Sequence, residues 1–250
     1  MDLGLVGRVA LVMGASKGIG RGIAAALARE GARVAIASRS REAIEATAAE
    51  LDGETIGLVA DAGDLERMRT LPGEVTEALG PIEILVTNTG GPPAGAALDH
   101  DREEWDEAYR TLVLGPRVLI EEVLPAMRER GWGRIVNVAS SSVREPIPHL
   151  ALSNVHRMAA VGLFKTLASE VAADGITLNS VATGRFATDR LASNWGSWEE
   201  MEQGAVQGVP AGRLGAPEEF GDLVAFICSE RAAFLTGTVI PLDGGLLHSA

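Results

Sequence analysis

The sequence predicts a single α/β domain, a doubly wound parallel β-sheet with helices on both faces. Two observations predict this class. Short runs rich in β-branched residues alternate along the chain with longer segments of helical periodicity. The centres of these runs, such as 84–86 and 135–136, are continuously apolar, which is typical of strands covered on both faces. The 250 residues are enough to bury the core of such a sheet.

The individual elements follow from this alternation. The expected strands, in chain order, are Val9–Met13, Arg33–Ala37, Thr55–Ala60, Ile82–Thr87, Arg134–Ala139, Thr177–Ala182 and Thr238–Pro241. The expected helices cover residues 19–30, 41–51, 64–79, 102–130, 154–173 and 217–230. The segment 185–213 is too long for an ordinary loop, and we expect it to be a lid on the one domain, 1–250.

A glycine-rich turn follows the first expected strand, in the order Gly14-Ala-Ser-Lys-Gly18-Ile-Gly20, and a helix is expected directly after it. Glycine permits the tight turn and lets the backbone approach a bound group closely. The start of the helix adds free N–H groups and the positive end of the helix dipole. This arrangement predicts a Rossmann-type site for the diphosphate of a dinucleotide.

The G-x-x-x-G-x-G spacing resembles the short-chain dehydrogenase/reductase family, and later landmarks extend the resemblance over nearly the whole chain. These landmarks are Asp61, Thr87-Asn-Thr-Gly90, Ile135-Val-Asn-Val-Ala-Ser140, Leu178-Asn-Ser-Val-Ala-Thr-Gly184, Leu235-Thr-Gly237 and Asp243-Gly-Gly245. Segments 88–93 and 152–157 are similar to a divergent branch related to 3-oxoacyl-carrier-protein reductases. The resemblance implies cofactor contacts at Gly14, Ser16, Lys17, Gly18, Ile19, Gly20, Ser38, Arg39, Asp61, Ala62, Asn88, Gly90, Arg157, Gly184 and Thr188.

The end of the second strand bears on the choice of cofactor. NAD-preferring proteins of this kind usually carry an acidic residue there, which hydrogen-bonds the ribose 2′-hydroxyl. This chain has Ser38 and Arg39 instead, and Lys17 lies in the glycine-rich turn. Two cations would attract a 2′-phosphate, which a carboxylate would repel. We therefore predict NADP(H) in preference to NAD(H). The alternative is that Arg39 and Lys17 are solvated surface charges.

The catalytic residues of the family are only partly present. The resemblance implies a tetrad of Asn, Ser, Tyr and Lys, in which Tyr exchanges a proton with the substrate. Ser140 matches the serine, but Ser153 stands at the Tyr position, Arg157 at the Lys position and Leu112 at the Asn position. The candidate catalytic residues are therefore Ser140, Ser153 and Arg157. A serine hydroxyl is a weaker acid than a phenol, so Ser153, His149 and water all remain candidates for the proton donor.

Two functions are compatible with this pattern. The first is an oxidoreductase that transfers hydride between NADP(H) and a carbonyl or alcohol substrate, with a non-standard active site. The second is a catalytically inactive nucleotide-binding protein that acts as a sensor or an assembly partner. We favour the enzyme, because Ser140, the cofactor positions and the lid all persist. In the lid, Trp195, Trp198 and Met201 either wall an apolar pocket or pin the lid to the body, and Arg185 is a candidate contact for an anionic substrate.

Composition restricts the remaining partners. With 34 acidic and 22 basic residues the net charge is -12, which disfavours nucleic-acid binding. No apolar stretch of about 18 residues occurs, so no membrane span is expected. The single cysteine, Cys228, is expected to be a buried thiol, and no metal site is expected. We expect a cytoplasmic protein, and the family resemblance implies a homotetramer, with a dimer next.

Overall fold

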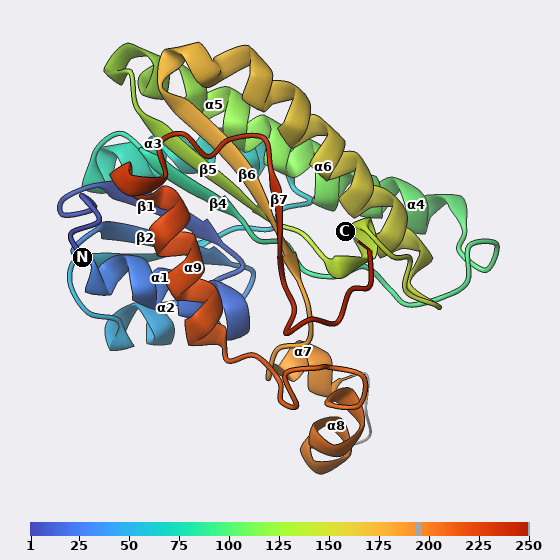
Figure 1. Ribbon diagram of the computed structural model, residues 1–250. Helices are drawn as coiled ribbons and strands as arrows, with labels where there is room; N and C mark the ends of the chain where they lie inside the picture. Colours follow the sequence, from blue (N-terminus) through green and yellow to red (C-terminus); the bar gives the residue numbers. More distant parts are fainter. Residues whose placement is uncertain (194–196, 250) are drawn as a thin grey trace.

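The computed structural model describes residues 1–193 and 197–249. At its centre lies a seven-stranded sheet in the order β3-β2-β1-β4-β5-β6-β7, in which neighbouring strands are parallel (Figure 1). The predicted parallel sheet is confirmed. The strands are β1 (Val9–Met13), β2 (Arg33–Ser38), β3 (Thr55–Val59), β4 (Ile84–Thr87), β5 (Gly133–Val138), β6 (Ile176–Thr183) and β7 (Val239–Leu242).

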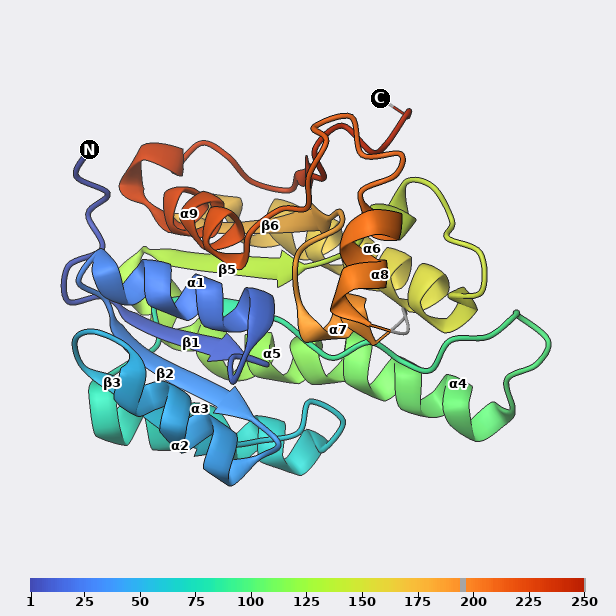
Figure 2. The ribbon, with the colours of Figure 1, turned by 90° about the horizontal axis from the view of Figure 1, so that it is seen from below.

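Helices cover both faces of this sheet (Figures 1 and 2). One face carries α1 (Gly18–Arg29), α2 (Arg41–Glu50) and α9 (Pro217–Cys228). The other carries α3 (Leu65–Leu79), α5 (Gly115–Arg130) and α6 (Ala151–Val171). Because side chains alternate along a strand, β1 sends Ala10 and Val12 to the first face and Leu11 and Met13 to the second. The doubly wound arrangement predicted from the sequence is confirmed.

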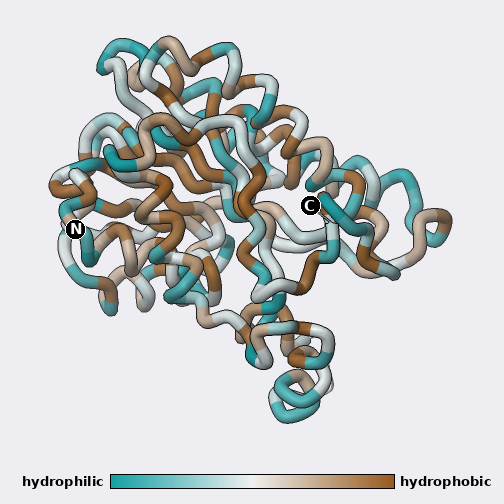
Figure 3. Tube along the Cα trace, in the orientation of Figure 1, coloured by the Kyte–Doolittle hydropathy of each residue, from teal (hydrophilic) through white to brown (hydrophobic). Residues whose placement is uncertain are grey.

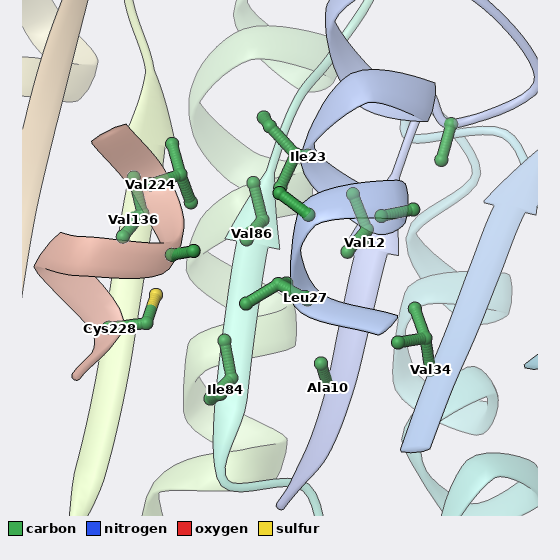
Figure 4. Close-up of a cluster of buried hydrophobic side chains, with 14 of the residues drawn as sticks. Ala10, Val12, Ile23, Leu27, Val34, Ile84, Val86, Val136, Val224 and Cys228 are labelled. Atoms are coloured by element: carbon green, nitrogen blue, oxygen red, sulfur yellow. The ribbon is translucent and has the colours of Figure 1, made fainter. Parts of the chain in front are cut away.

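The apolar core follows the strands through the centre of the molecule (Figure 3). Between α1, α9 and the sheet, Ile23 and Leu27 lie over Val86 and its neighbours (Figure 4). Cys228, at the end of α9, is buried in the same cluster, as expected. Burial raises the pKa of its thiol to about 12, so the group is held neutral and acts as a small apolar side chain.

Two helices differ from the sequence prediction. The expected helix 102–130 is divided into α4 (Arg102–Tyr109), a π-helical turn (Arg110–Leu114) and α5. The π turn lies where the helix meets the loop after β3, since a Cβ added to Gly115 would be 2.1 Å from the carbonyl oxygen of Ala62. The sequence also started the later helix at residue 154, whereas α6 begins at Ala151. Ser153 and Arg157 therefore lie one turn apart on the same helix.

The carboxyl ends of the parallel strands meet at one edge of the sheet, where open α/β sheets bind their ligands. Gly14 and Asn88 directly follow β1 and β4 at this edge, and Ser140 follows β5 by two residues. Two short helices, α7 (Asp189–Ala192) and α8 (Trp198–Ala205), form a protrusion beyond it (Figure 1). Within the described ranges, none of the helices is both long enough and apolar enough to cross a membrane.

Candidate functional site

The glycine-rich turn between β1 and α1 has a backbone that larger residues could not adopt. Gly14 and Gly18 have φ angles of +59° and +56°, in the left-handed region. A Cβ at Gly20 would lie 2.2 Å from the carbonyl oxygen of Gly14. Asn88, from the loop after β4, donates its Nδ2 to that same oxygen at 3.0 Å. The two loops at the centre of the sheet are thereby held together.

The start of α1 provides donors to this turn. Lys17 occupies the N-cap position, but no side chain caps the helix and no acidic residue lies in its first turn. The first backbone N–H groups of a helix have no partner within the helix, and the helix dipole makes this end positive. The turn therefore offers backbone donors in a space kept open by glycine, the donor set that suits a diphosphate.

The residues expected at the 2′-position of the ribose lie at the end of β2. Ser38 is buried, and its hydroxyl donates to the carbonyl oxygen of Ser40 at 3.3 Å. Arg39 is exposed. Lys17 pairs with Asp189 of α7, with Nζ 2.9 Å from Oδ2, and both side chains are largely exposed. Lys17 thus links the glycine-rich turn to the segment 185–213 through an exposed ion pair.

At the outer end of this edge, Asp61 accepts a hydrogen bond from the backbone N–H of Gly63 at 3.0 Å. A surface hollow of about 640 Å³ lies here, lined by Asp61, Gly63, Asp64, Leu65, Glu66, Glu107 and Arg110. It does not include Ser140, Ser153 or Arg157, so it marks the outer side of the expected adenine end and not the reaction centre.

The structure brings Ser153 and Arg157 together. Arg157 donates its Nε to the Ser153 Oγ at 3.1 Å and its Nη1 to the carbonyl oxygen of Val138 at 2.9 Å. The guanidinium thus joins the first turns of α6 to the end of β5. Burial and, secondarily, the cation of Arg190 lower the pKa of Arg157 to about 10. Arg157 therefore remains a cation at neutral pH, and it directly contacts the hydroxyl of Ser153.

Ser140 follows β5 by two residues. Its Oγ accepts from the backbone N–H of Ser142 at 3.1 Å and so caps a short 3₁₀ helix (Ser141–Val143), which packs against α6. Leu112, at the position of the family's Asn, is buried in the π turn. An apolar side chain there cannot take part in a hydrogen-bonded proton path.

The histidines of this region differ in their placement. His149 has a φ of +59°, and its carbonyl oxygen accepts from the N–H of Gly95 at 2.7 Å. Its backbone therefore ties the loop before α6 to the loop after β4. His156 is buried, with Nδ1 2.8 Å from the carbonyl oxygen of Leu152, and its ring lies 5.3 Å from the ring of Trp105. This places His156 in the packing between α6 and α4.

Thr188, in segment 185–213, lies beside the glycine-rich turn. Its Oγ1 accepts from the N–H of Leu191 at 3.3 Å and caps α7. Its methyl group lies beside Gly18, where a Cβ would be only 3.3 Å away. Gly184, just before the segment, packs tightly against Asp243, since a Cβ would lie 2.4 Å from the Asp243 Cα.

The expected pocket walls in this segment are only partly visible. Met201 is fully buried, whereas Trp198 is about half exposed. Trp195 lies outside the described residues. Arg185 donates Nη1 to the carbonyl oxygens of Ala205 and Gln207, at 2.8 and 2.7 Å. Arg185 thus joins two parts of the same segment. This supports a structural role for Arg185 and not a contact with an anionic substrate.

Arg190 is a candidate that sequence reasoning missed. Its Nη2 donates to the carbonyl oxygen of Pro92 at 3.3 Å, in the loop after β4. Its guanidinium lies so close to Gly91 that a Cβ there would be 2.6 Å from Nη2. No local pattern marks Arg190, because its position depends on a loop almost 100 residues earlier. The available signal was the pair Gly90-Gly91 in segment 88–93, because glycine leaves room for a side chain from elsewhere in the fold.

Comparison with known proteins agrees with this architecture. A family model described as Enoyl-(Acyl carrier protein) reductase matches residues 14–247. Human "Dehydrogenase/reductase SDR family member 4" is 35% identical over 245 residues, which cover 96% of this chain and 88% of that protein. The 3-oxoacyl-(acyl-carrier-protein) reductase FabG of Haemophilus influenzae is 36% identical over 243 residues, covering 97% of this chain and 99% of that protein.

Among solved structures, this chain is similar to L-sorbose reductase from Gluconobacter frateurii, which was determined in complex with NADPH and L-sorbose. The TM-score is 0.95 and the sequence identity is 29%, and the match covers 100% of both chains. The likeness therefore extends over the sheet, its helices and the segment 185–213.

Proposed function

The chain belongs to the short-chain dehydrogenase/reductase family, and from this premise we propose that it transfers hydride between NADP(H) and the carbonyl or alcohol carbon of a small molecule. The observation that carries the proposal is the glycine-rich turn before an uncapped α1, held by Asn88. This backbone fits a dinucleotide diphosphate, because glycine leaves space for it and helix N–H groups point into that space. The segment 185–213 is proposed as the lid.

The preference for NADP(H) is supported by the absence of a carboxylate at the end of β2. Ser38 and the exposed Arg39 lie there instead, and Lys17 is near in the glycine-rich turn. A guanidinium can bind a phosphate through two hydrogen bonds at once. The alternative, that Lys17 and Arg39 are only solvated charges, is tested directly by removing Arg39.

The test is a calorimetric titration of NADPH and NADH into the wild type, Arg39→Ala and the control Arg41→Ala. Arg41 is an exposed neighbour that pairs with Glu45 at 3.1 Å and is not proposed to touch the cofactor. We expect Arg39→Ala to weaken NADPH binding about tenfold, which corresponds to a charged hydrogen bond, and to leave NADH binding unchanged. Equal losses for Arg39→Ala and Arg41→Ala, or equal affinity of the wild type for both cofactors, would refute the preference.

We further propose that the Ser153 hydroxyl exchanges the proton with the substrate oxygen, and that Ser140 donates a second hydrogen bond to that oxygen. Because Arg157 occupies one lone pair of the Ser153 Oγ, the O–H proton of Ser153 is left to donate. A cation 3.1 Å from the Ser153 Oγ attracts negative charge on that oxygen. Arg157 is thus suited to stabilise the alkoxide that Ser153 would become. The nicotinamide, when bound, supplies or accepts the hydride.

Single substitutions on α6 test this assignment. Ser153→Ala removes the proposed acid, and Ser169→Ala on the same helix removes a hydroxyl that donates to the carbonyl oxygen of Thr166. The rate of NADPH oxidation across a panel of carbonyl compounds is expected to fall about 10²- to 10⁴-fold for Ser153→Ala and to remain unchanged for Ser169→Ala. An unchanged rate for Ser153→Ala would show that water or His149 supplies the proton.

A catalytically inactive nucleotide-binding protein is the second candidate function. The buried Leu112 favours it, since the apolar side chain interrupts the polar path that the family's Asn provides. Under this alternative NADPH binds, but no carbonyl compound in the panel is reduced.

A homotetramer remains our proposal for the assembly. Val155 and Met158 on α6 are each 50% exposed, and Tyr109 on α4 is 45% exposed. Apolar side chains gathered on one face of a helix layer are typical of a contact between subunits. Sedimentation velocity of the wild type and Met158→Glu tests this, and a monomeric wild type would contradict it.

A further inference from the structure

Most arginines of this acidic chain pair with carboxylates, but Arg157 and Arg190 do not. These two contact the end of β5 and the loop after β4 at the carboxyl edge of the sheet, unlike Arg134 and Arg185, which also bond to carbonyl oxygens. Across residues 1–193 and 197–249, no ion pair joins either guanidinium to Asp or Glu. The carboxylate next to Arg190 in sequence, Asp189, pairs with Lys17. Both arginines are nevertheless held in place, Arg190 by the carbonyl oxygen of Pro92 and Arg157 by that of Val138.

The two guanidiniums approach the reaction centre from different elements. Arg157 reaches it from α6, and Arg190 reaches it from α7 across the loop after β4. The loop that Arg190 contacts is joined to the start of α6, because the N–H of Gly95 donates to the carbonyl oxygen of His149 at 2.7 Å. In agreement with this geometry, the cation of Arg190 lowers the pKa of Arg157. Arg157 has lost part of its water and is repelled by the exposed cation of Arg190, and no carboxylate among the described residues forms an ion pair with either of them. The site thus has a deficit of negative charge that a ligand can fill.

Arg157 has unused donors with a defined geometry. A guanidinium carries five N–H groups. Nε is directed at Ser153 and one Nη1 hydrogen at Val138, so the second Nη1 hydrogen and both Nη2 hydrogens remain. A planar fork of this kind matches the two oxygens of a carboxylate. The same guanidinium contacts the Ser153 hydroxyl, so a carboxylate on this fork would lie close to a carbonyl that Ser153 protonates.

We propose that Arg157 and Arg190 together bind a carboxylate of the substrate, so that the protein acts on small 2-oxo or 3-oxo acids and the corresponding hydroxy acids. This inference rests on the proposed hydride-transfer function. Gly91 contributes by leaving room for the Arg190 guanidinium. In the reduction, the carbonyl carbon would take a hydride from bound NADPH and the carbonyl oxygen would take the proton of Ser153, which gives NADP⁺ and the hydroxy acid. The Ser153 oxygen, stabilised meanwhile by Arg157, then regains a proton from water. The carboxylate does not react.

The first test compares matched substrates. The wild type is assayed with NADPH and a set of 2-oxo and 3-oxo acids of three to six carbons, each beside its methyl ester. The expected result is a kcat/KM at least tenfold higher for one or more acids than for their esters. Arg190→Gln, which retains an N–H donor for Pro92 but has no charge, is expected to lose about 10- to 100-fold with the acid and to leave the ester unchanged. Arg102→Ala, which removes an exposed cation from α4, serves as the charge-matched control. Equal rates for acids and esters, or an equal loss of both in Arg190→Gln, would overturn the inference.

The second test does not depend on turnover. Oxamate, a non-reducible analogue of a 2-oxo acid, is added to NADP⁺-saturated wild type and its neutral counterpart oxamide is added in parallel. Oxamate is expected to raise Tm in the wild type and in Arg102→Ala, and to have no effect in Arg190→Gln. Absence of a shift in the wild type contradicts carboxylate binding. If oxamate binds through Arg190 but no carbonyl compound is reduced, the anion site stands and the proposed hydride transfer fails.

Discussion

Replacing Arg157 by methionine tests whether its charge is retained for function at the expense of stability. Burial and the cation of Arg190 lower the pKa of Arg157 from 12.5 to about 10. This shift means that the charged form destabilises the folded state by at most about 3 kcal/mol. The value is an upper limit because the partly exposed guanidinium retains some water. A cation whose pKa is lowered by folding is protonated in both the folded and the unfolded state below about pH 10. The destabilisation of the folded state by this charge is therefore fully present at pH 7 and disappears as the pH rises from about 10 towards 12.5.

The substitution also removes a hydrogen-bond donor. The carbonyl oxygen of Val138 loses the Nη1 donor at 2.9 Å, which costs about 1–3 kcal/mol if nothing replaces it. Methionine fills much of the same volume and restores apolar contact. The free energy of unfolding at pH 7 is therefore expected to remain unchanged or to rise by up to about 2 kcal/mol, which shifts Tm upward by up to about 8 °C for a chain of this length.

Thermal unfolding at pH 7 without cofactor provides the measurement, and Arg134→Met is the matched control. Arg134 is also buried, but it donates to the carbonyl oxygens of Gly133, Gly175 and Ser229 and lies 4.3 Å from the centre of the Trp132 ring. Its loss is expected to lower Tm by more than about 4 °C. If Arg157→Met lowers Tm as much as Arg134→Met does, Arg157 is a stabilising residue and the reasoning is wrong.

Three further predictions concern the turn, its link to α7 and the cysteine. Asp189→Asn frees Lys17 from an exposed ion pair. It is expected to tighten NADPH binding about two- to fivefold at low salt and to leave NADH binding unchanged. At high salt the affinities of the variant and the wild type for NADPH should be equal. Gly20→Ala places a Cβ 2.2 Å from the carbonyl oxygen of Gly14 and should abolish cofactor binding, as measured by calorimetric titration. Gly73→Ala in α3, where a Cβ would have nothing within 4 Å, should stabilise the fold by about 1 kcal/mol, as measured by thermal unfolding. Because burial raises the pKa of Cys228 to about 12, iodoacetamide at pH 8 is expected to label the unfolded chain only, and labelling of the folded protein would contradict the placement.

Much of the fold could be predicted because its signals are local. The apolar run of β1, the glycines after it and the helical period of α1 are all read within about 20 residues, and backbone hydrogen bonding allows few other structures for them. The contact between Ser153 and Arg157 could also be predicted, since residues four apart on a helix lie on one face. The helix start was placed three residues late, because Leu150 and Ala151 carry no capping signal.

The remaining features of the candidate site depend on residues far apart in the chain. Segment 185–213 contains two plausible anion-binding arginines, and the sequence reasoning chose Arg185. The structure turns Arg185 back to the carbonyl oxygen of Ala205 and places Arg190 beside Gly91. The link between Lys17 and Asp189 is of the same kind, joining positions 172 residues apart.

By itself, the sequence determined the parallel sheet and the glycine-rich turn after β1, because both follow from patterns along a single strand, turn or helix. The positions of Ser153 and Arg157, where the family has Tyr and Lys, were implied by the family resemblance. Only the tertiary structure decided which cations have no carboxylate partner, because a charge is neutralised by whatever lies near it in space. That distribution of paired and unpaired charge, set by packing at the carboxyl edge of the sheet, is the basis for proposing that Arg157 and Arg190 bind an anion.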